Sequence, residues 1–328
     1  MFVGVMLSVV LVACSSGASK TAETIPATTP TAETIPATTP TADLTCDPPE
    51  HLDCNGANLS FADLTGVNLT GANLRYANLK GADLTGAILT KADLTLADLT
   101  GATLKGADLS FATINANLQN ANLTSANLHG ANLWGADLTG AIFASANLTG
   151  ATLHGAMMKR AMLAGADMTG QVDLTGANLS FAELMGVDLN GANLSFADLT
   201  SAVLTGANLT AATLKGANLT GAKLTGASMY ASNFTLANLS LADLTGVDLR
   251  KVNLKGVNLS HAILRDANLD NADLTGVNLT GADLTNTQLV FANLSGANFS
   301  GAVMPGANLT GAVWIGVIGL DGSYVGVG

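Results

Sequence analysis

Apolar and polar residues repeat with a period of five along most of the chain. A large apolar residue, leucine in 43 of 52 units, recurs at every fifth position from Leu59 to Trp314, apart from two interruptions. Alanine lies two positions before it in 43 units, and the position between holds Asn in 22 units and Asp in 14. This period fits neither an α-helix nor a simple strand. Each unit must therefore contain a short extended segment and a corner.

The positions within one unit indicate which side chains point inward. Side chains two apart on an extended segment lie on the same side, so the alanine and the leucine of each unit share one face. The remaining positions favour Thr, Ser and Gly, which are typical of tight turns. The pattern therefore predicts an all-β solenoid whose interior is lined by alanine and leucine.

The unit Ala-(Asn/Asp)-Leu-Xaa-Xaa resembles the motif of the pentapeptide-repeat family over residues 57–316. The resemblance implies a right-handed quadrilateral β-helix with four units per coil, and 52 units then give about 13 coils. At the spacing of neighbouring strands, such a rod is roughly 60 Å long. A single coil buries too little apolar surface to offset its ordering entropy, so stability is expected from stacking.

The two interruptions are of opposite sign. The step from Ile114 to Leu118 is one residue shorter than five, and Gln171 makes a later unit one residue longer than five. Because the two offsets cancel, the residues return to the same face, which suggests a fixed rotational register.

The N-terminal segments predict an export signal and a tether. Residues 1–13 carry an apolar run suited to a signal peptide, although no Lys or Arg precedes it, which a start codon upstream of Met1 would explain. The run ends in Leu-Val-Ala-Cys, which resembles the lipobox of bacterial lipoproteins and implies lipidation of Cys14. Residues 14–45 are rich in Thr and Pro and contain a repeated decapeptide, which predicts a disordered linker.

Both ends of the array are expected to be capped. Residues 46–56 are predicted to form an N-terminal cap, with a disulfide between Cys46 and Cys54 or, alternatively, two unpaired thiols. At the other end, residues 317–328 are predicted as a Gly-rich tail. Trp314, Ile315 and Tyr324 are expected to cover the last coil.

Composition and charge exclude some functions. Charged residues make up 11% of the chain and aromatic residues 4%, which is unlike a conventional globular protein. The net charge of −11 excludes a basic protein that binds the phosphate backbone of nucleic acids, so no nucleic-acid partner is expected. No apolar run is long enough to span a bilayer as a helix.

The sequence offers little chemistry. The four histidines, His51, His129, His154 and His261, do not share a face, and most Asp residues occupy the position where family side chains brace the coil. We therefore expect no catalytic residues, no cofactor-binding residues and no metal ligands, and hence a non-enzymatic protein.

One face differs from the other three. Its units carry Asn or Asp before the leucine in only 5 of 13 coils, and instead it is marked by outward apolar residues. These candidate interaction residues are Ile142, Met162, Met185, Val203, Ile263 and Val303. An exposed apolar stripe of this kind can be an interface, although neutral drift at exposed positions explains it nearly as well.

The leading hypothesis is a lipid-anchored, extracytoplasmic, non-catalytic rod that acts as a structural or protein-binding scaffold. Its partner would be an unidentified protein or envelope component, and a homo-oligomer is a further option. The main alternative comes from family members that mimic duplex DNA and bind a type II topoisomerase (gyrase). A net charge of −5 over residues 56–314 is low for a surface that imitates DNA. Ice or surface binding is a third option. It would use the hydroxyl ladder Ser180, Thr200, Thr220, Ser240, Ser260, Thr280 and Ser300.

Overall fold

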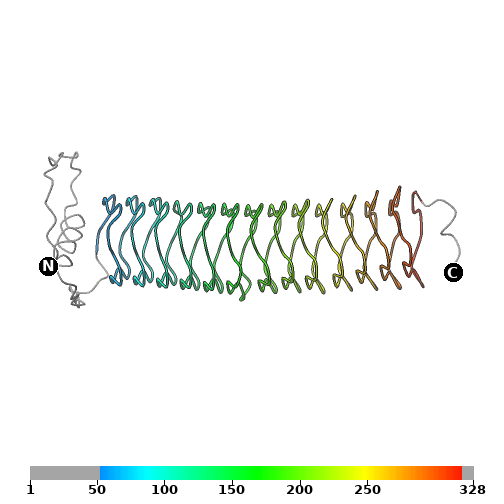
Figure 1. Ribbon diagram of the computed structural model, residues 1–328, viewed down its shortest axis with the longest axis horizontal. Coiled ribbons are helices and arrows are strands. Elements are labelled where there is room, and N and C mark those ends of the chain that lie inside the picture. The colour runs from blue at the N-terminus through cyan, green and yellow to red at the C-terminus, as the bar shows by residue number, and fades with distance from the viewer. Residues whose placement is uncertain (1–51, 320–328) are drawn as a thin grey trace, which may run out of the picture.

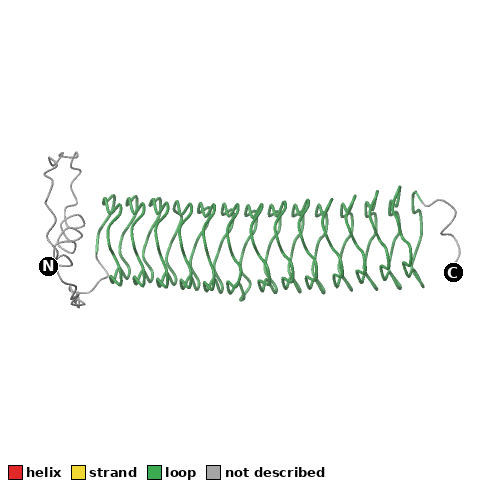
Figure 2. Ribbon diagram, in the orientation of Figure 1, coloured by secondary structure: helices red, strands yellow, loops and turns green. Residues whose placement is uncertain are grey.

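The computed structural model describes residues 52–319, which form one long rod of stacked coils (Figure 1). Within these residues there is no helix and no continuous strand, and each five-residue unit consists of one bridged residue and a turn (Figure 2). The predicted signal peptide, the predicted linker, residues 46–51 of the predicted cap and residues 320–328 of the predicted tail lie outside the described residues.

Parallel bridges join residues that are, in most coils, twenty apart, from Asp53↔Asn73 to Asn298↔Ile318. Each bridge uses the residue before the buried leucine. At Asn78, for example, the Leu59 N–H donates to the Asn78 carbonyl (2.7 Å), and the Asn78 N–H donates to the Ala57 carbonyl (2.9 Å). This ladder confirms the predicted β-helix, whereas the count of about 13 coils stays a prediction.

The bridged residues form four columns along the rod, which we number by their first members. Column 1 begins at Asp53, column 2 at Asn58, column 3 at Asp63 and column 4 at Asn68. The bridges run from Asp53 to Ile318 and so include residues on both sides of the predicted range 57–316.

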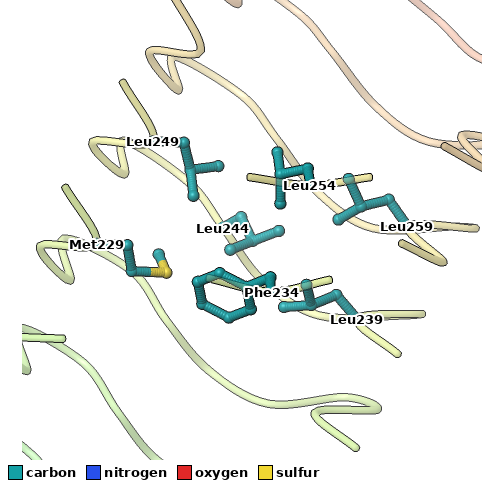
Figure 3. Close-up of a pocket in the computed structure, with 7 residues that line it drawn as sticks. All are labelled: Met229, Phe234, Leu239, Leu244, Leu249, Leu254 and Leu259. Carbon is teal, nitrogen blue, oxygen red and sulfur yellow. The ribbon is translucent and has the colours of Figure 1, made fainter. Parts of the chain in front are cut away.

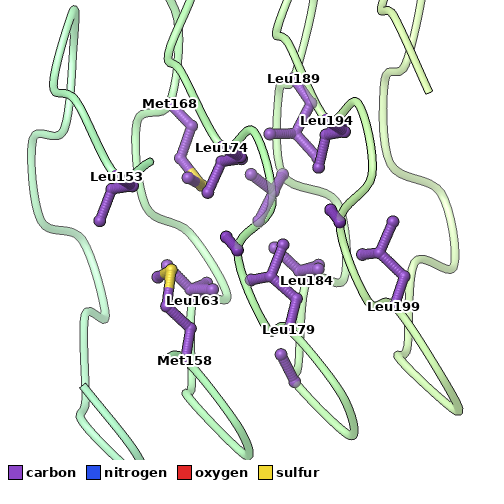
Figure 4. Packing of buried hydrophobic residues seen from close by; sticks show 14 of the residues in the cluster. Leu153, Met158, Leu163, Met168, Leu174, Leu179, Leu184, Leu189, Leu194 and Leu199 are labelled. Atoms are coloured by element: carbon purple, nitrogen blue, oxygen red, sulfur yellow. The ribbon is translucent and has the colours of Figure 1, made fainter. Parts of the chain in front are cut away.

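The core consists of the predicted alanines and leucines. From Leu64 to Phe299 the central residues have at most 2% of their surface exposed, and Figure 4 shows leucine and methionine side chains of successive coils packed against one another. Complete burial of a leucine contributes roughly 2 kcal/mol. The larger Phe143, Phe234 and Phe299 also fit inside.

Apart from the two interruptions, the corners share two features. The alanine N–H donates to the preceding leucine carbonyl, as at Ala72 and Leu69 (3.0 Å), and the residue before the alanine has a φ near +60°. Glycine is common there because it adopts this conformation without steric cost. Bridged Asn and Asp side chains accept the N–H two residues later, as Asp63 Oδ1 does from Thr65 (3.1 Å), which accounts for their frequency.

Both interruptions are absorbed at their own corners. The bridge Asp98↔Asn117 joins residues nineteen apart, and Thr152↔Asp173 joins residues twenty-one apart, yet the columns continue without a shift. The register therefore does not depend on the two interruptions cancelling, because each coil is aligned directly on its neighbour.

The core is less covered at the ends of the rod. Leu52, Ala62 and Val67 at one end and Leu309 and Val317 at the other are only partly buried. Trp314 packs on the last coil with its ring centroid 5.9 Å from that of Phe299. Ile315, which was also expected to cover this coil, is 74% exposed, and Tyr324 lies outside the described residues.

Candidate functional site

The interior of the rod is closed. Figure 3 shows a small void in the core, where side chains of successive coils converge and leave no room for a water-sized sphere. It is lined by Met229, Phe234, Leu239, Leu244, Leu249, Leu254 and Leu259. An apolar space of this size stays dry. A candidate site in residues 52–319 must therefore lie on the outer surface.

Hydrogen bonds hold the pKa of several carboxylates of the coils, such as Asp167 and Asp137, below the usual value. The backbone N–H and hydroxyl of Thr169 donate to Asp167 at 3.0 and 2.7 Å, and these bonds hold its pKa below the usual value. Burial raises the pKa of Asp137, but hydrogen bonds from Gln119 and Thr139 outweigh burial and lower it. These groups brace turns, and a lowered pKa does not suit a general acid at neutral pH.

The described histidines lie apart. His154 Nδ1 is 3.9 Å from Asp173 Oδ2, the His129 ring packs edge-on against Phe111, and His261 lies against Gly281. No group of three His, Cys, Asp or Glu residues between 52 and 319 is arranged to hold a metal ion. His51 lies outside the described residues.

Of the three cysteines, only Cys54 lies within the described residues. Cys54 is buried in the first coil and disulfide-bonded. Cys46, its predicted partner, and Cys14, the predicted lipidation site, lie outside the described residues. The pairing and the lipidation therefore stay predictions.

Four of the six predicted interaction residues lie on consecutive coils. Ile142 bridges to Met162, Met162 to Glu183 and Glu183 to Val203 in column 3, and Met185 is two residues from Glu183. Met162 and Met185 are 37% and 56% exposed. We call Ile142, Met162, Met185 and Val203 the apolar patch.

The other two residues do not extend this patch. Ile263 is bridged to Asp243 on one side and to Asp283 on the other, and Val303 follows Asp283. Lys223 and Asp243 also separate Val203 from Ile263. Lys223, Asp243 and Asp283 therefore divide the predicted stripe into one patch, which itself contains Glu183, and two separate residues.

Sequence reasoning missed a hollow at the shortened corner. It has a volume of about 340 Å³ and opens on the edge between columns 1 and 2; we call it the notch. Its lining residues are Leu96, Ala97, Asp98, Asn115, Ala116, Asn117, Gly135 and Asp137. The signal in the sequence is the residue missing between Ile114 and Leu118, which indicates a short corner but not the hollow beside it.

The hydroxyl ladder of column 2 is largely bonded within the chain. The hydroxyls of Ser180, Thr220 and Thr280 donate to the Asn two residues earlier, at 2.6–2.7 Å. Ser180 is also 5% exposed. Hydroxyls that donate inward present few free donors to an external lattice.

The described residues, 52–319, contain no helix that could span a membrane.

Comparisons with known proteins agree with this architecture. A family model described as pentapeptide repeats matches overlapping segments that together cover residues 53–112, 114–240 and 242–313. No match was found among curated proteins.

Several solved structures are similar to the chain. HetL, a pentapeptide repeat protein involved in heterocyst differentiation regulation in Nostoc sp. strain PCC 7120, is 32% identical over 82% of this chain and 92% of its own, with a TM-score of 0.27. A pentapeptide repeat protein of the Arabidopsis thaliana thylakoid lumen is 37% identical over 32% of this chain and 69% of its own, with a TM-score of 0.20. QnrB1, a plasmid-mediated fluoroquinolone resistance protein, is 19% identical over 65% of this chain and 91% of its own, with a TM-score of 0.36.

Proposed function

Because the chain belongs to the pentapeptide-repeat family, we propose that it is a non-catalytic scaffold that binds a protein partner on its outer surface. In this proposal the body is a right-handed, quadrilateral β-helix of about 13 coils. A lipid on Cys14 and the linker of residues 14–45 hold the body outside the cytoplasm at a membrane surface.

The observation that carries the proposal is the closed interior. The central side chains fill the rod, and the void around Phe234 admits no water, so the core has no place for a substrate. The carboxylates with lowered pKa values are engaged in bracing turns. What the rod does offer is a regular outer surface of defined length, which suits a scaffold.

The apolar patch is the surface best suited to a protein partner on column 3. Methionine side chains adapt to irregular partners, and Met162 and Met185 are the most exposed members of the patch. The adjacent Ala144 and Ala164 are small and leave the methionines accessible. We propose that this patch is the main contact with the partner.

The patch can be tested with a pair of matched variants. Met162→Asp combined with Val203→Asp is expected to abolish association, measured by sedimentation of the purified chain and by capture of partners from the producing cells. The control is Ile263→Asp combined with Val303→Asp, which adds the same charge on the same column outside the patch. Equal capture by both pairs would contradict the role of the patch.

The anchor requires a separate experiment. Labelling with a palmitate analogue is expected to mark the parent chain and not Cys14→Ala, and only the parent should fractionate with membranes. An unlabelled parent that remains in the soluble fraction together with a type II topoisomerase would instead support the DNA-mimic alternative.

A further inference from the structure

We propose that the notch is a second binding site, separate from the apolar patch, which receives an arginine side chain of a partner polypeptide. The site combines a hollow of about 340 Å³, two acceptors that no donor within residues 52–319 reaches (the Trp134 carbonyl and Asp98 Oδ2), and exposed apolar side chains on the same edge of the rod. The hollow and the carbonyl without a donor follow from the loss of one residue at one corner.

The hollow exists because the corner after Ile114 is one residue short. At a complete corner the chain runs from leucine through two turn residues to alanine, as in Leu133-Trp134-Gly135-Ala136, but here Asn115 alone separates Ile114 from Ala116. The bridges of column 2 nevertheless continue through Asp98, Asn117 and Asp137. The coils therefore remain stacked, and only the corner itself is missing.

The missing residue leaves a backbone carbonyl without its donor. At most complete corners the positive-φ residue donates its N–H to the corner carbonyl of the next coil, as Leu96 does to Asn115 (2.6 Å). The residue that would donate to the Trp134 carbonyl is the one that is absent. Among the described residues no backbone N–H donates to this carbonyl, which belongs to the residue before Gly135 in the lining of the notch.

Two carboxylates add further acceptors. Asp98 accepts from Thr100 through Oδ1, and no hydrogen bond within residues 52–319 reaches its Oδ2. Asp137 Oδ2 accepts from Gln119 Nε2 at 2.5 Å and retains lone-pair capacity. Asn117 lies between the two carboxylates in the column. Two carboxylates and a backbone carbonyl suit the several N–H donors of a guanidinium better than the compact ammonium of lysine.

The rim of the notch indicates that the arginine comes from a polypeptide. Tyr76, Leu96 and Trp134 lie on the same edge in neighbouring coils and are 55%, 56% and 57% exposed. Exposed Tyr and Trp beside a polar pocket are typical of the centres of protein interfaces. A partner that inserts an arginine would cover these side chains with apolar residues flanking the arginine.

The test uses the full chain with Trp314→Phe, which leaves Trp134 as the only tryptophan. The probes are the peptide acetyl-Gly-Leu-Arg-Leu-Gly-amide and its citrulline counterpart, which has nearly the same shape but no charge. The arginine peptide is expected to change Trp134 fluorescence saturably, and the citrulline peptide should bind at least tenfold more weakly.

Two variants and one control locate the binding. Asp98→Asn combined with Asp137→Asn should weaken binding at least tenfold, and a glycine inserted between Asn115 and Ala116 should abolish it by filling the notch. Asp243→Asn combined with Asp283→Asn makes the same charge change at complete corners, also two coils apart in one column, and should bind like the parent. Thermal unfolding of each variant verifies that the coils remain folded.

The proposal is overturned if citrulline binds as well as arginine, or if either notch variant binds like the control. N-acetyl-arginine amide serves as a probe without flanking residues. If it binds as tightly as the peptide, the partner is not a polypeptide. The apolar-patch variants leave the notch intact, so failure of one proposal is distinguishable from failure of the other.

Discussion

At the scale of single residues, the corners couple side chains that lie one coil apart. Where a phenylalanine occupies the positive-φ position, its ring lies over the corner glycine of the next coil, as for Phe61 with Gly81 and Phe196 with Gly216. A Cβ built on Gly216 would lie 2.8 Å from the Phe196 ring, whereas one on Gly206 would meet nothing within 4 Å. A large corner residue therefore determines which residue is tolerated one coil later.

We predict that Gly216→Ala destabilises the chain more than Gly206→Ala. Both positions have φ near +65°, so both substitutions impose a strain of about 1 kcal/mol on an L-residue. Only Gly216→Ala must also displace a ring, which adds on the order of 1 kcal/mol. Urea denaturation measures the difference.

A double-mutant cycle isolates the coupling. In a Phe196→Ala background the cost of Gly216→Ala should fall to that of Gly206→Ala. An unchanged cost in that background would show that the ring contact is not the cause.

At the scale of the repeating unit, each coil is aligned by its own bridges. The bridge Thr152↔Asp173 accommodates the additional residue Gln171 at one corner, and the next bridges follow in the same columns. Gln171 itself has φ +62° and is exposed, so it contributes little to the core. The unit is thus tolerant of length changes at the corner and intolerant of changes in its buried positions.

We predict that deletion of Gln171 leaves the chain folded, with a melting temperature equal to or above that of the parent. The deletion restores a standard unit and removes one strained left-handed residue, which is worth about 1 kcal/mol. Circular dichroism and calorimetry measure the outcome. A large loss of stability would mean that the two interruptions must cancel, in contradiction to local alignment.

The period of five predicted the core and the coil, because every inward position repeats the same steric requirement. It did not predict the division of the apolar face, since Ile263 is isolated by Asp243 and Asp283, which are distant in sequence and adjacent in the column. Nor did it predict the notch. A missing residue indicates a short corner, but the hollow also depends on Leu96 and Gly135, which belong to the coils on either side.

At the scale of the whole molecule, stability is distributed along one dimension. Each coil contacts only the coils before and after it, so a defect weakens two interfaces in the middle of the rod and one at its end. Leu189 is fully buried in the middle, whereas Leu309 near the C-terminal end of the described rod is only partly buried.

We therefore predict that Leu189→Ala costs about 3 kcal/mol and Leu309→Ala about 1 kcal/mol, because a cavity in a closed core adds to the lost burial. Guanidinium denaturation measures both values. Equal costs would indicate that residues outside 52–319 bury Leu309 as completely as a further coil would.

The uniform bridge register has an evolutionary consequence. Because column alignment is decided between adjacent turns, duplicating one turn's worth of coding sequence lengthens the molecule without redesigning any existing contact. The length of the rod can therefore change without any change in the surface residues of the existing coils. Unequal crossing-over that duplicates or removes whole coils would change the distance of the notch from either end of the rod.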